Sequence, residues 1–279
     1  MPEADWQAQP QCGTVSAVFP EQLQLDAHRD KFEEMKQATK TFLSRKRIPP
    51  RERLILALDV PKITEAKKLV RRLGDSVIFY KIGLQLFMTG GYFDLAKWLR
   101  ARKKQVLVDL KFFDVPETVR LAMKQLKPWH ATMVTVHGND EMLRAAVSEK
   151  NGIKILAVTV LTSLDESDMK ALGFQTDIKA VVESRAKRAL KLGCDGLISS
   201  GIEAPALREK FGHKFLIVTP GIRPGSNRPI DDQKRTVDVE EAFNNGADYI
   251  VVGRPILNAA DQKTAADAIQ TRIAALFAK

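Results

Sequence analysis

Eight short runs rich in β-branched and other apolar residues recur along the chain, and each precedes a segment with helix signals. The runs span residues 54–60, 77–84, 105–112, 132–138, 153–162, 195–201, 214–222 and 248–256. Helices are expected from Thr64 and Pro116 onward and over residues 177–192 and 239–245, with a glycine following each of the last two. Eight strands that alternate with helices over ~220 residues are typical of a (β/α)8 barrel.

The main alternative for this pattern is a doubly wound open sheet. Such a sheet usually has a glycine-rich turn after its first strand, and residues 59–66, with the sequence DVPKITEA, contain no glycine. We therefore predict an α/β fold, a (β/α)8 TIM barrel, over residues 51–279. Residues 1–50 are interpreted as an N-terminal extension, partly helical over residues 22–47, where apolar residues recur at helical spacing. We expect this helix to cover the bottom of the barrel.

Composition restricts the class of protein. The chain has 279 residues, of which 44% are hydrophobic and 28% are charged, so a packed core is expected. No apolar run approaches the ~20 residues of a membrane span, and the opening MPEADWQAQP lacks the pattern of a secretory signal. Cys12 and Cys194 are the only cysteines, which indicates neither a disulfide framework nor a zinc site. These features favour a cytoplasmic location and no membrane partner.

The formal net charge of +10 invites a comparison with nucleic-acid-binding proteins. The positive charge is spread along the chain, and the one dense basic block is SRKRIPPRER at residues 44–53. Aromatic residues are few and do not alternate with arginine, as stacking platforms for bases would require. A phosphorylated small substrate explains part of the charge equally well, so we expect no nucleic-acid partner.

The run DLKFFDVPETV, residues 109–119, carries the most distinctive chemistry of the chain. Asp109 and Lys111 lie two apart at the end of an apolar strand, so they should share a face of it, and Asp114 follows just beyond. Inward-facing charges are costly unless paired, and paired charges shift each other's pKa values. A structural ion pair at the mouth of the sheet is the alternative interpretation of an isolated Asp-x-Lys.

Other polar residues also fall at the predicted carboxyl ends of strands, where a (β/α)8 barrel places its active site. Asp59 ends the first strand, Lys81 comes late in the second, and residues 162–163 follow the fifth. The loops after the seventh and eighth strands are the usual phosphate site of this fold. Gly221 there permits a close approach of backbone to an anion, and Arg254 can clamp phosphate oxygens. An ordinary turn and a surface ion pair are the alternatives, but the two residues together at this location favour a phosphate site.

Taken together, these residues resemble those of the orotidine 5′-phosphate decarboxylases. The matching segments occur in family order and at family spacing, and they are ALDV (57–60), YKIGLQLF (80–87), DLKFFDVPETV (109–119), VTVLTS (158–163), TPGIRP (219–224), DDQKR (231–235) and VGRPI (252–256). The resemblance covers residues 54–277. It implies decarboxylation of orotidine 5′-monophosphate to uridine 5′-monophosphate, a step of pyrimidine biosynthesis, without cofactor or metal.

The resemblance also implies a catalytic role for a network of alternating charges, Lys81, Asp109, Lys111 and Asp114. Lys111 would protonate C6 of the pyrimidine, and Asp109 would crowd the departing carboxylate. Asp114 would reach into the active site of a neighbouring subunit, which implies a homodimer with shared active sites.

Substrate-binding roles follow from the same resemblance. Asp59 and Lys81 would hold ribose hydroxyls, with Thr118 contributing across the subunit interface, and Ser163 would contact the pyrimidine. The phosphate would be held by three further residues, Gly221, Gln233 and Arg254.

Two local departures and two other function classes accompany this interpretation. The family often has histidine where Phe113 stands and alanine where Gly138 stands. The nearest alternative is a Mg²⁺-dependent relative of the hexulose-phosphate synthase or keto-gulonate-phosphate decarboxylase type, which has an acid near the position of Lys81. A non-catalytic barrel that binds phosphorylated ligands is the other alternative.

Overall fold

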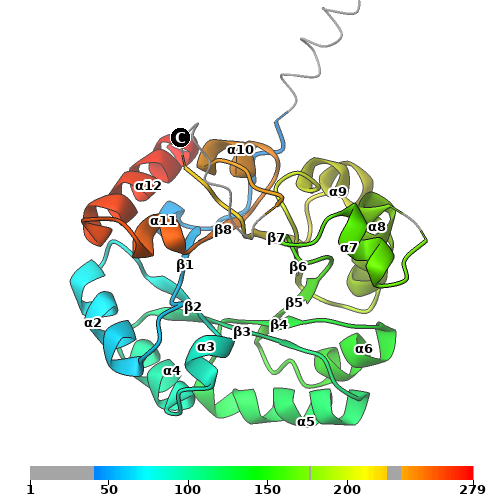
Figure 1. The fold of residues 1–279 in the computed structure, drawn as a ribbon, viewed down its shortest axis with the longest axis horizontal. Coiled ribbons are helices and arrows are strands. Elements are labelled where there is room, and N and C mark those ends of the chain that lie inside the picture. Colours follow the sequence, from blue (N-terminus) through cyan, green and yellow to red (C-terminus); the bar gives the residue numbers. More distant parts are fainter. Residues whose placement is uncertain (1–40, 176, 225–233, 279) are drawn as a thin grey trace, which may run out of the picture. The chain divides into compact units, whose positions relative to one another are not determined.

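Eight parallel strands form a closed barrel in which each strand pairs with the next and β8 pairs with β1 (Figure 1). The computed structural model describes residues 41–175, 177–224 and 234–278. The strands are β1 (Leu54–Ala57), β2 (Phe79–Gly83), β3 (Gln105–Phe112), β4 (Met133–Val136), β5 (Lys154–Val158), β6 (Gly196–Ile198), β7 (Leu216–Thr219) and β8 (Tyr249–Val252). The predicted (β/α)8 barrel is therefore confirmed, and the open sheet was the wrong alternative.

Helices surround the ring of strands (Figure 1). They are α2 (Ile63–Leu73), α3 (Leu84–Phe87), α4 (Tyr92–Ala101), α5 (Pro116–Leu126), α6 (Asp140–Ser148), α7 (Glu166–Ala171), α8 (Ile178–Lys191), α9 (Ala204–Phe211), α10 (Val239–Asn244), α11 (Arg254–Leu257) and α12 (Gln262–Phe277). Two short 3₁₀ helices are η1 (Pro50–Glu52) and η2 (Lys127–Trp129). Asparagine or aspartate side chains accept hydrogen bonds from the first turns of α6, α7, α8, α10 and α12, which explains where those helices begin.

Alternation along the strands divides the apolar residues into two cores. One set faces the helices, and a smaller set fills the barrel interior, where Phe79 and Tyr249 meet edge to face. The apolar filling stops partway up the barrel. Above it, towards the carboxyl ends of the strands, the inward positions are polar, beginning with Lys81, Asp109 and Thr135. The carboxyl end of the barrel is therefore the end where polar side chains point into the interior and can form an active site.

The opposite end is closed by residues 41–49, which are not helical. Ile48 packs against the interior core. Asp248, directly before β8, forms ion pairs with the cationic side chains around it. Its buried carboxylate lies 2.9 Å from Lys46 Nζ and 2.8 Å from Arg208 Nη2, and it also accepts a hydrogen bond from Ser44 Oγ at 2.5 Å. Hydrogen bonds to this carboxylate hold the segment in place without helical structure.

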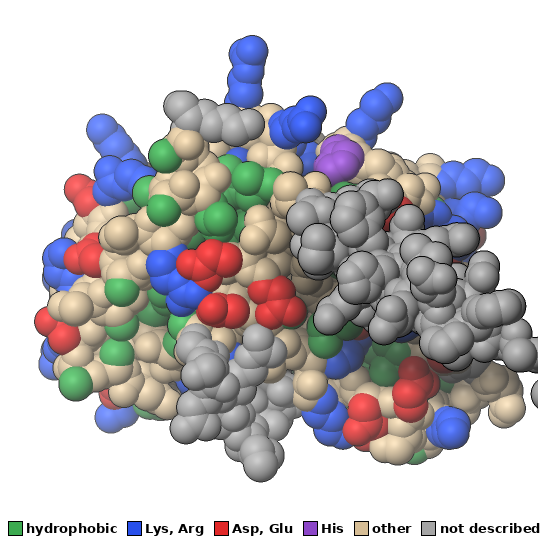
Figure 2. Space-filling model, turned by 90° about the horizontal axis from the view of Figure 1, so that it is seen from above, with side chains coloured by type: hydrophobic (Ala, Val, Ile, Leu, Met, Phe, Trp, Pro, Cys, Tyr) green, Lys and Arg blue, Asp and Glu red, His purple; other side chains and the backbone are tan. Residues whose placement is uncertain are grey.

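The helix predicted over residues 22–47 is therefore wrong for residues 41–47, and the remainder of it lies outside the described residues. Within those residues, no helix is both long and apolar enough to cross a membrane. On the face shown in Figure 2, lysine and arginine side chains are interspersed with acidic ones rather than gathered in a single patch.

Candidate active site

Asp109 lies between two lysine ammonium groups at the carboxyl end of the barrel. Its Oδ2 is 3.2 Å from Lys81 Nζ, and its Oδ1 is 2.9 Å from Lys111 Nζ. Lys81 Nζ is also 3.1 Å from Oδ1 of Asp59, at the end of the first strand. The structure therefore brings together four of the predicted residues in one chain of alternating charge.

The end of β3 is not a plain strand. Its register with β4 shifts between Val108 and Phe112, and Lys111 has a φ of +47°, in the left-handed region that non-glycine residues seldom adopt. The Lys111 amide donates to Thr135 Oγ1 at 2.9 Å, a side chain rather than a ladder carbonyl. The bulge, and not simple alternation, therefore sets the backbone from which Lys111 reaches Asp109.

The ion pairs favour the charged forms of Asp109 and Lys81. Burial alone would raise the pKa of Asp109, but Lys81, Lys111 and the Thr135 hydroxyl together hold it below its ordinary value. Burial alone would lower the pKa of Lys81, but the carboxylates of Asp109 and Asp59 raise it. Asp109 therefore stays anionic and Lys81 cationic, and the two lysines present positive charge at the mouth of the barrel.

A glycine makes room for the Lys81 ammonium. A Cβ at Gly83 would lie 3.3 Å from Lys81 Nζ, closer than most Cβ contacts, and at an ordinary contact distance of 3.6 Å from Asp59 Oδ1. The side chain of Asp59 is 49% exposed, so part of its carboxylate is accessible from the barrel mouth. This side of the site can therefore accept hydrogen bonds from a polyhydroxyl ligand.

Asp114 and Thr118 lie at the start of α5 and are exposed. The Asp114 carboxylate accepts a hydrogen bond from the Val115 amide at 2.7 Å. In the described part of the chain it is not a member of the ion-pair network around Asp109. Ser163, half-buried, follows β5 at the same end of the barrel.

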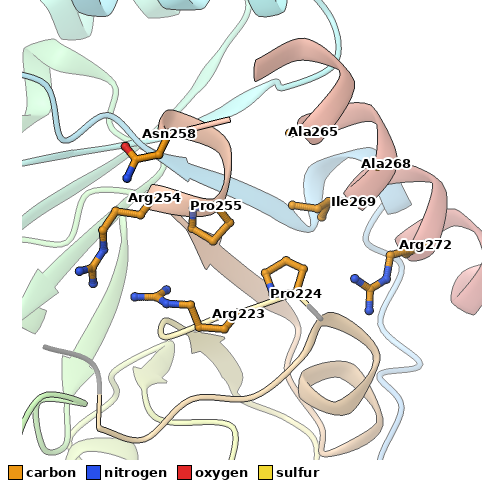
Figure 3. A pocket seen from close by; sticks show the side chains of 9 residues that line it. All are labelled: Arg223, Pro224, Arg254, Pro255, Asn258, Ala265, Ala268, Ile269 and Arg272. Atoms are coloured by element: carbon orange, nitrogen blue, oxygen red, sulfur yellow. The ribbon is translucent and has the colours of Figure 1, made fainter. Parts of the chain in front are cut away.

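Arginines line a cavity of about 600 Å³ between the end of β7, α11 and α12. Figure 3 shows the side chains of Arg223 and Arg254 at one side of this cavity and Arg272 at the other. Arg272 is engaged by Asp238 at 2.6 Å and by Glu240. Gly221 has a φ of +77° and lies two residues before Arg223 in the same loop. Because Arg223 and Arg254 line the same cavity, the predicted anion-binding residues Gly221 and Arg254 lie at one end of the barrel. Gln233 lies outside the described residues.

Three residues at the site were missed by reasoning from the sequence: Gly83, Thr135 and Arg223. A signal was present for Thr135, a polar residue in an apolar strand at an inward position beside Asp109. A signal was also present for Arg223, since it stands inside the quoted segment TPGIRP. The role of Gly83 depends on where Lys81 Nζ lies, which no local pattern reveals.

The two departures from the family pattern lie side by side. Phe113 packs edge-on against His137, with ring centroids 5.6 Å apart. Gly138 has a φ of +124°, and a Cβ there would lie 2.2 Å from Met142 Sδ and 3.2 Å from the Phe113 ring. Met142, with Phe113 beside it, therefore fills the space that the Cβ of an alanine at residue 138 would occupy.

The described residues contain no cluster of three or more His, Cys, Asp or Glu side chains suited to a metal ion. What the site does offer is an ammonium group, Lys111 Nζ, held beside a fixed carboxylate and partly exposed at 35%. Such an arrangement can stabilise a developing anion and deliver a proton to it. Arginines across the barrel mouth can bind a remote anionic group.

Comparisons with a family model and with known proteins all point to the same family. Residues 52–269 match the model of the orotidine 5′-phosphate decarboxylase / HUMPS family. The orotidine 5′-phosphate decarboxylase of Methylococcus capsulatus is 58% identical over 237 residues, 85% of this chain and 98% of that protein. That of Stenotrophomonas maltophilia is 48% identical over 241 residues, 85% of this chain and 99% of that protein.

Solved structures agree. The crystal structure of orotidine 5′-phosphate decarboxylase from Lactobacillus acidophilus superposes with a TM-score of 0.70 at 35% identity. The match covers 80% of this chain and 99% of that one.

Proposed function

The chain belongs to the orotidine 5′-phosphate decarboxylase family, and from this membership we infer that it converts orotidine 5′-monophosphate into uridine 5′-monophosphate and CO₂. It is thus a carboxy-lyase of pyrimidine biosynthesis. One observation supports assigning this function to individual residues: Asp59, Lys81, Asp109 and Lys111 form a series of ion pairs at the mouth of the barrel.

In the proposed reaction, the bond between C6 of the pyrimidine and its carboxylate breaks, CO₂ leaves, and the electron pair stays on C6. The Lys111 ammonium stabilises this pair and then donates a proton to it, which completes uridine 5′-monophosphate. The ammonium is preorganised by its contact with Asp109 at 2.9 Å, so little reorganisation is needed as the charge develops.

Asp109 has two roles in this proposal. Its anionic carboxylate orients Lys111, and it lies where the substrate carboxylate must leave, so the two negative groups repel each other in the ground state. Lys81 keeps Asp109 ionised through their contact at 3.2 Å. The charges form one coupled set, and removing any member changes the others.

Substrate binding is proposed to use both sides of the barrel mouth. Asp59 and Lys81 bind ribose hydroxyls, with Thr118 of a second subunit assisting, and Ser163 contacts the pyrimidine. Gly221, Gln233 and Arg254 bind the phosphate, and the cavity beside Arg254 gives that group a place remote from C6. Binding energy from the phosphate can then contribute to the transition state rather than to ground-state binding alone.

A homodimer with shared active sites is proposed because Asp114 is left out of the charge network of its own chain. Leu84, Phe87 and Met88, at α3, and Phe113, Val115 and Leu121, at α5 and the turn before it, form a set of exposed apolar side chains, each at least 42% exposed. Six of the eight large apolar side chains found exposed in the described part of the chain belong to this set. Burying it against a second copy would bring Asp114 and Thr118 towards the partner's site.

We further propose that the enzyme acts in the cytoplasm, as its cysteine usage suggests. The barrel over residues 51–279 is proposed as the decarboxylase domain, preceded by the extension of residues 1–50. Of this extension, residues 41–49 pack beneath the barrel.

The Mg²⁺-dependent alternative is disfavoured by Lys81. Its ammonium lies 3.1 Å and 3.2 Å from the carboxylates of Asp59 and Asp109, in the position that a divalent cation would need between two acids. A barrel that only binds phosphorylated ligands has no use for the Lys111–Asp109 pair.

The test is a spectrophotometric assay of purified protein with orotidine 5′-monophosphate, run with and without EDTA. We expect loss of the orotidine absorbance at the same rate in both, with uridine 5′-monophosphate and CO₂ as products. Full loss of activity with EDTA would support the metal-dependent alternative. Absence of turnover in folded protein would contradict the proposed function.

A further inference from the structure

Thr135 connects the two charged residues at the end of β3. It lies on the neighbouring strand β4 and is completely buried. Its Oγ1 is 2.9 Å from Asp109 Oδ1 and 2.9 Å from the Lys111 amide nitrogen. A carboxylate only accepts and an amide N–H only donates, so the direction of both hydrogen bonds is fixed: the hydroxyl donates to Asp109 and accepts from Lys111.

The position of these contacts explains why a hydroxyl is needed. The β3–β4 ladder is interrupted between Val108 and Phe112, so the Lys111 amide has lost its regular partner on β4. Thr135 Oγ1 takes the place of that partner and holds Lys111 at its positive φ of +47°. The same oxygen fixes the rotation of the Asp109 carboxylate, whose other oxygen contacts Lys81.

We propose that Thr135 is a positioning residue for the decarboxylation, acting by aligning Asp109 and the backbone of Lys111 with a single hydroxyl. The inference rests on the proposed roles of those two residues. Thr135 itself touches no reacting atom in this proposal. Its effect passes through the carboxylate that orients the Lys111 ammonium and through the backbone from which that ammonium extends.

The decisive variant is Thr135→Val, which preserves the shape of the side chain and removes the hydroxyl. We expect kcat to fall about 10- to 100-fold, the range for losing a hydrogen bond to a charged group, with KM changing less than about 3-fold. Thr135→Ser retains the hydroxyl and should stay within about 3-fold of the parent kcat. Thr159→Val is the matched control, because Thr159 is also buried and its hydroxyl donates to the Ile198 carbonyl at 3.0 Å rather than to a charged group of the network.

The pH profile supplies a readout that a purely structural role would not move. Besides the Thr135 hydroxyl, Asp109 is surrounded by Lys81 from β2, Lys111 from β3 and the Tyr92 phenol from α4. Loss of the hydroxyl removes a donor that favours the ionised carboxylate and therefore raises the pKa of Asp109. The acid limb of kcat should move to higher pH in Thr135→Val and stay in place in Thr135→Ser.

Thermal unfolding would establish that each variant is folded. An Asp109→Asn variant assayed alongside separates the positioning role of Thr135 from the proposed catalytic role of Asp109. Large loss in Asp109→Asn with parental kcat in folded Thr135→Val would overturn the positioning role alone. Retained activity in Asp109→Asn would overturn the assignment of the charged residues. A Thr135→Ser variant as impaired as Thr135→Val, or an equal loss in Thr159→Val, would also refute the inference.

Discussion

Lys111 combines an unusual backbone with the reactive side chain. Its φ of +47° costs on the order of 1–2 kcal/mol for a residue with a Cβ, a cost that the surrounding hydrogen bonds must offset. The gain is an ammonium placed 2.9 Å from Asp109 and still 35% exposed towards the barrel mouth. The strained backbone and the reactive ammonium group therefore belong to the same residue.

Lys111→Ala should lower kcat by at least about 10³-fold, because general acid catalysis and charge stabilisation at C6 are removed together. Lys103→Ala is the matched control, since Lys103 also has a positive φ, +59°, but is exposed far from the charge network. Steady-state assays of both variants, after thermal unfolding has verified their fold, make the comparison. Near-parental turnover in Lys111→Ala would remove the proposed proton donor.

Arg254→Ala should raise KM for orotidine 5′-monophosphate about 10- to 100-fold through loss of a charge-assisted contact with phosphate. The same substitution should leave the slow reaction of orotidine, which lacks phosphate, unchanged. Arg188→Ala, at an exposed arginine paired with Asp140, is the control. An equal effect of Arg254→Ala on both substrates would contradict phosphate binding at this residue.

The sequence indicated that Asp59, Lys81, Asp109 and Lys111 would lie close together, because each lies near the carboxyl end of an apolar run, whereas Asp114 lies outside their ion pairs in the described residues. The sequence did not reveal which atom contacts which. The hydrogen bonds of Thr135 depend on the offset between β3 and β4, and neither strand encodes that offset by itself.

Among the elements, β3 and β4 show how a local irregularity shapes the site. β3 was predicted with its observed bounds, whereas each of the other seven strands is shorter than its apolar run. Those runs continue past the last ladder pair into the loops of the active site, and Arg254 begins α11 instead of ending β8. Hydrophobicity measures burial, and buried loops at the barrel mouth carry the same signal as strands.

The turn after β4 provides a test at this scale. Gly138→Ala should lower the free energy of unfolding by about 1–3 kcal/mol more than Gly152→Ala. Both glycines have positive φ, +124° and +83°, but only at Gly138 would the new Cβ meet neighbouring atoms. Chemical denaturation of the two variants measures the difference. Equal destabilisation would show that the contact with Met142 is relieved without cost.

For the whole molecule, the proposed dimer makes each active site depend on two chains. Lys111→Ala and Asp114→Asn proteins are each expected to be impaired. Mixed under conditions of subunit exchange, they should regain about a quarter of parental activity, because half of the dimers are hybrids with one intact site each. Native mass spectrometry would verify the exchange, and each variant incubated alone is the control. Verified hybrids without regained activity would refute the shared site.

At this scale the sequence predicted the barrel well, because an eightfold alternation of strand and helix leaves few other folds. The segment before the barrel was predicted poorly. Apolar spacing over residues 22–47 favoured a helix, but the hydrogen bonds and ion pairs made by Asp248 hold residues 41–47 without helical structure. Tertiary contacts outweighed local propensity there.

The buried carboxylate of Asp248 lies at the amino ends of the strands, whereas the lysines that perform the reaction lie at the carboxyl ends. Substitutions that improve packing around Asp248 are therefore expected to raise heat tolerance while leaving the reacting lysines at the far end of the barrel untouched.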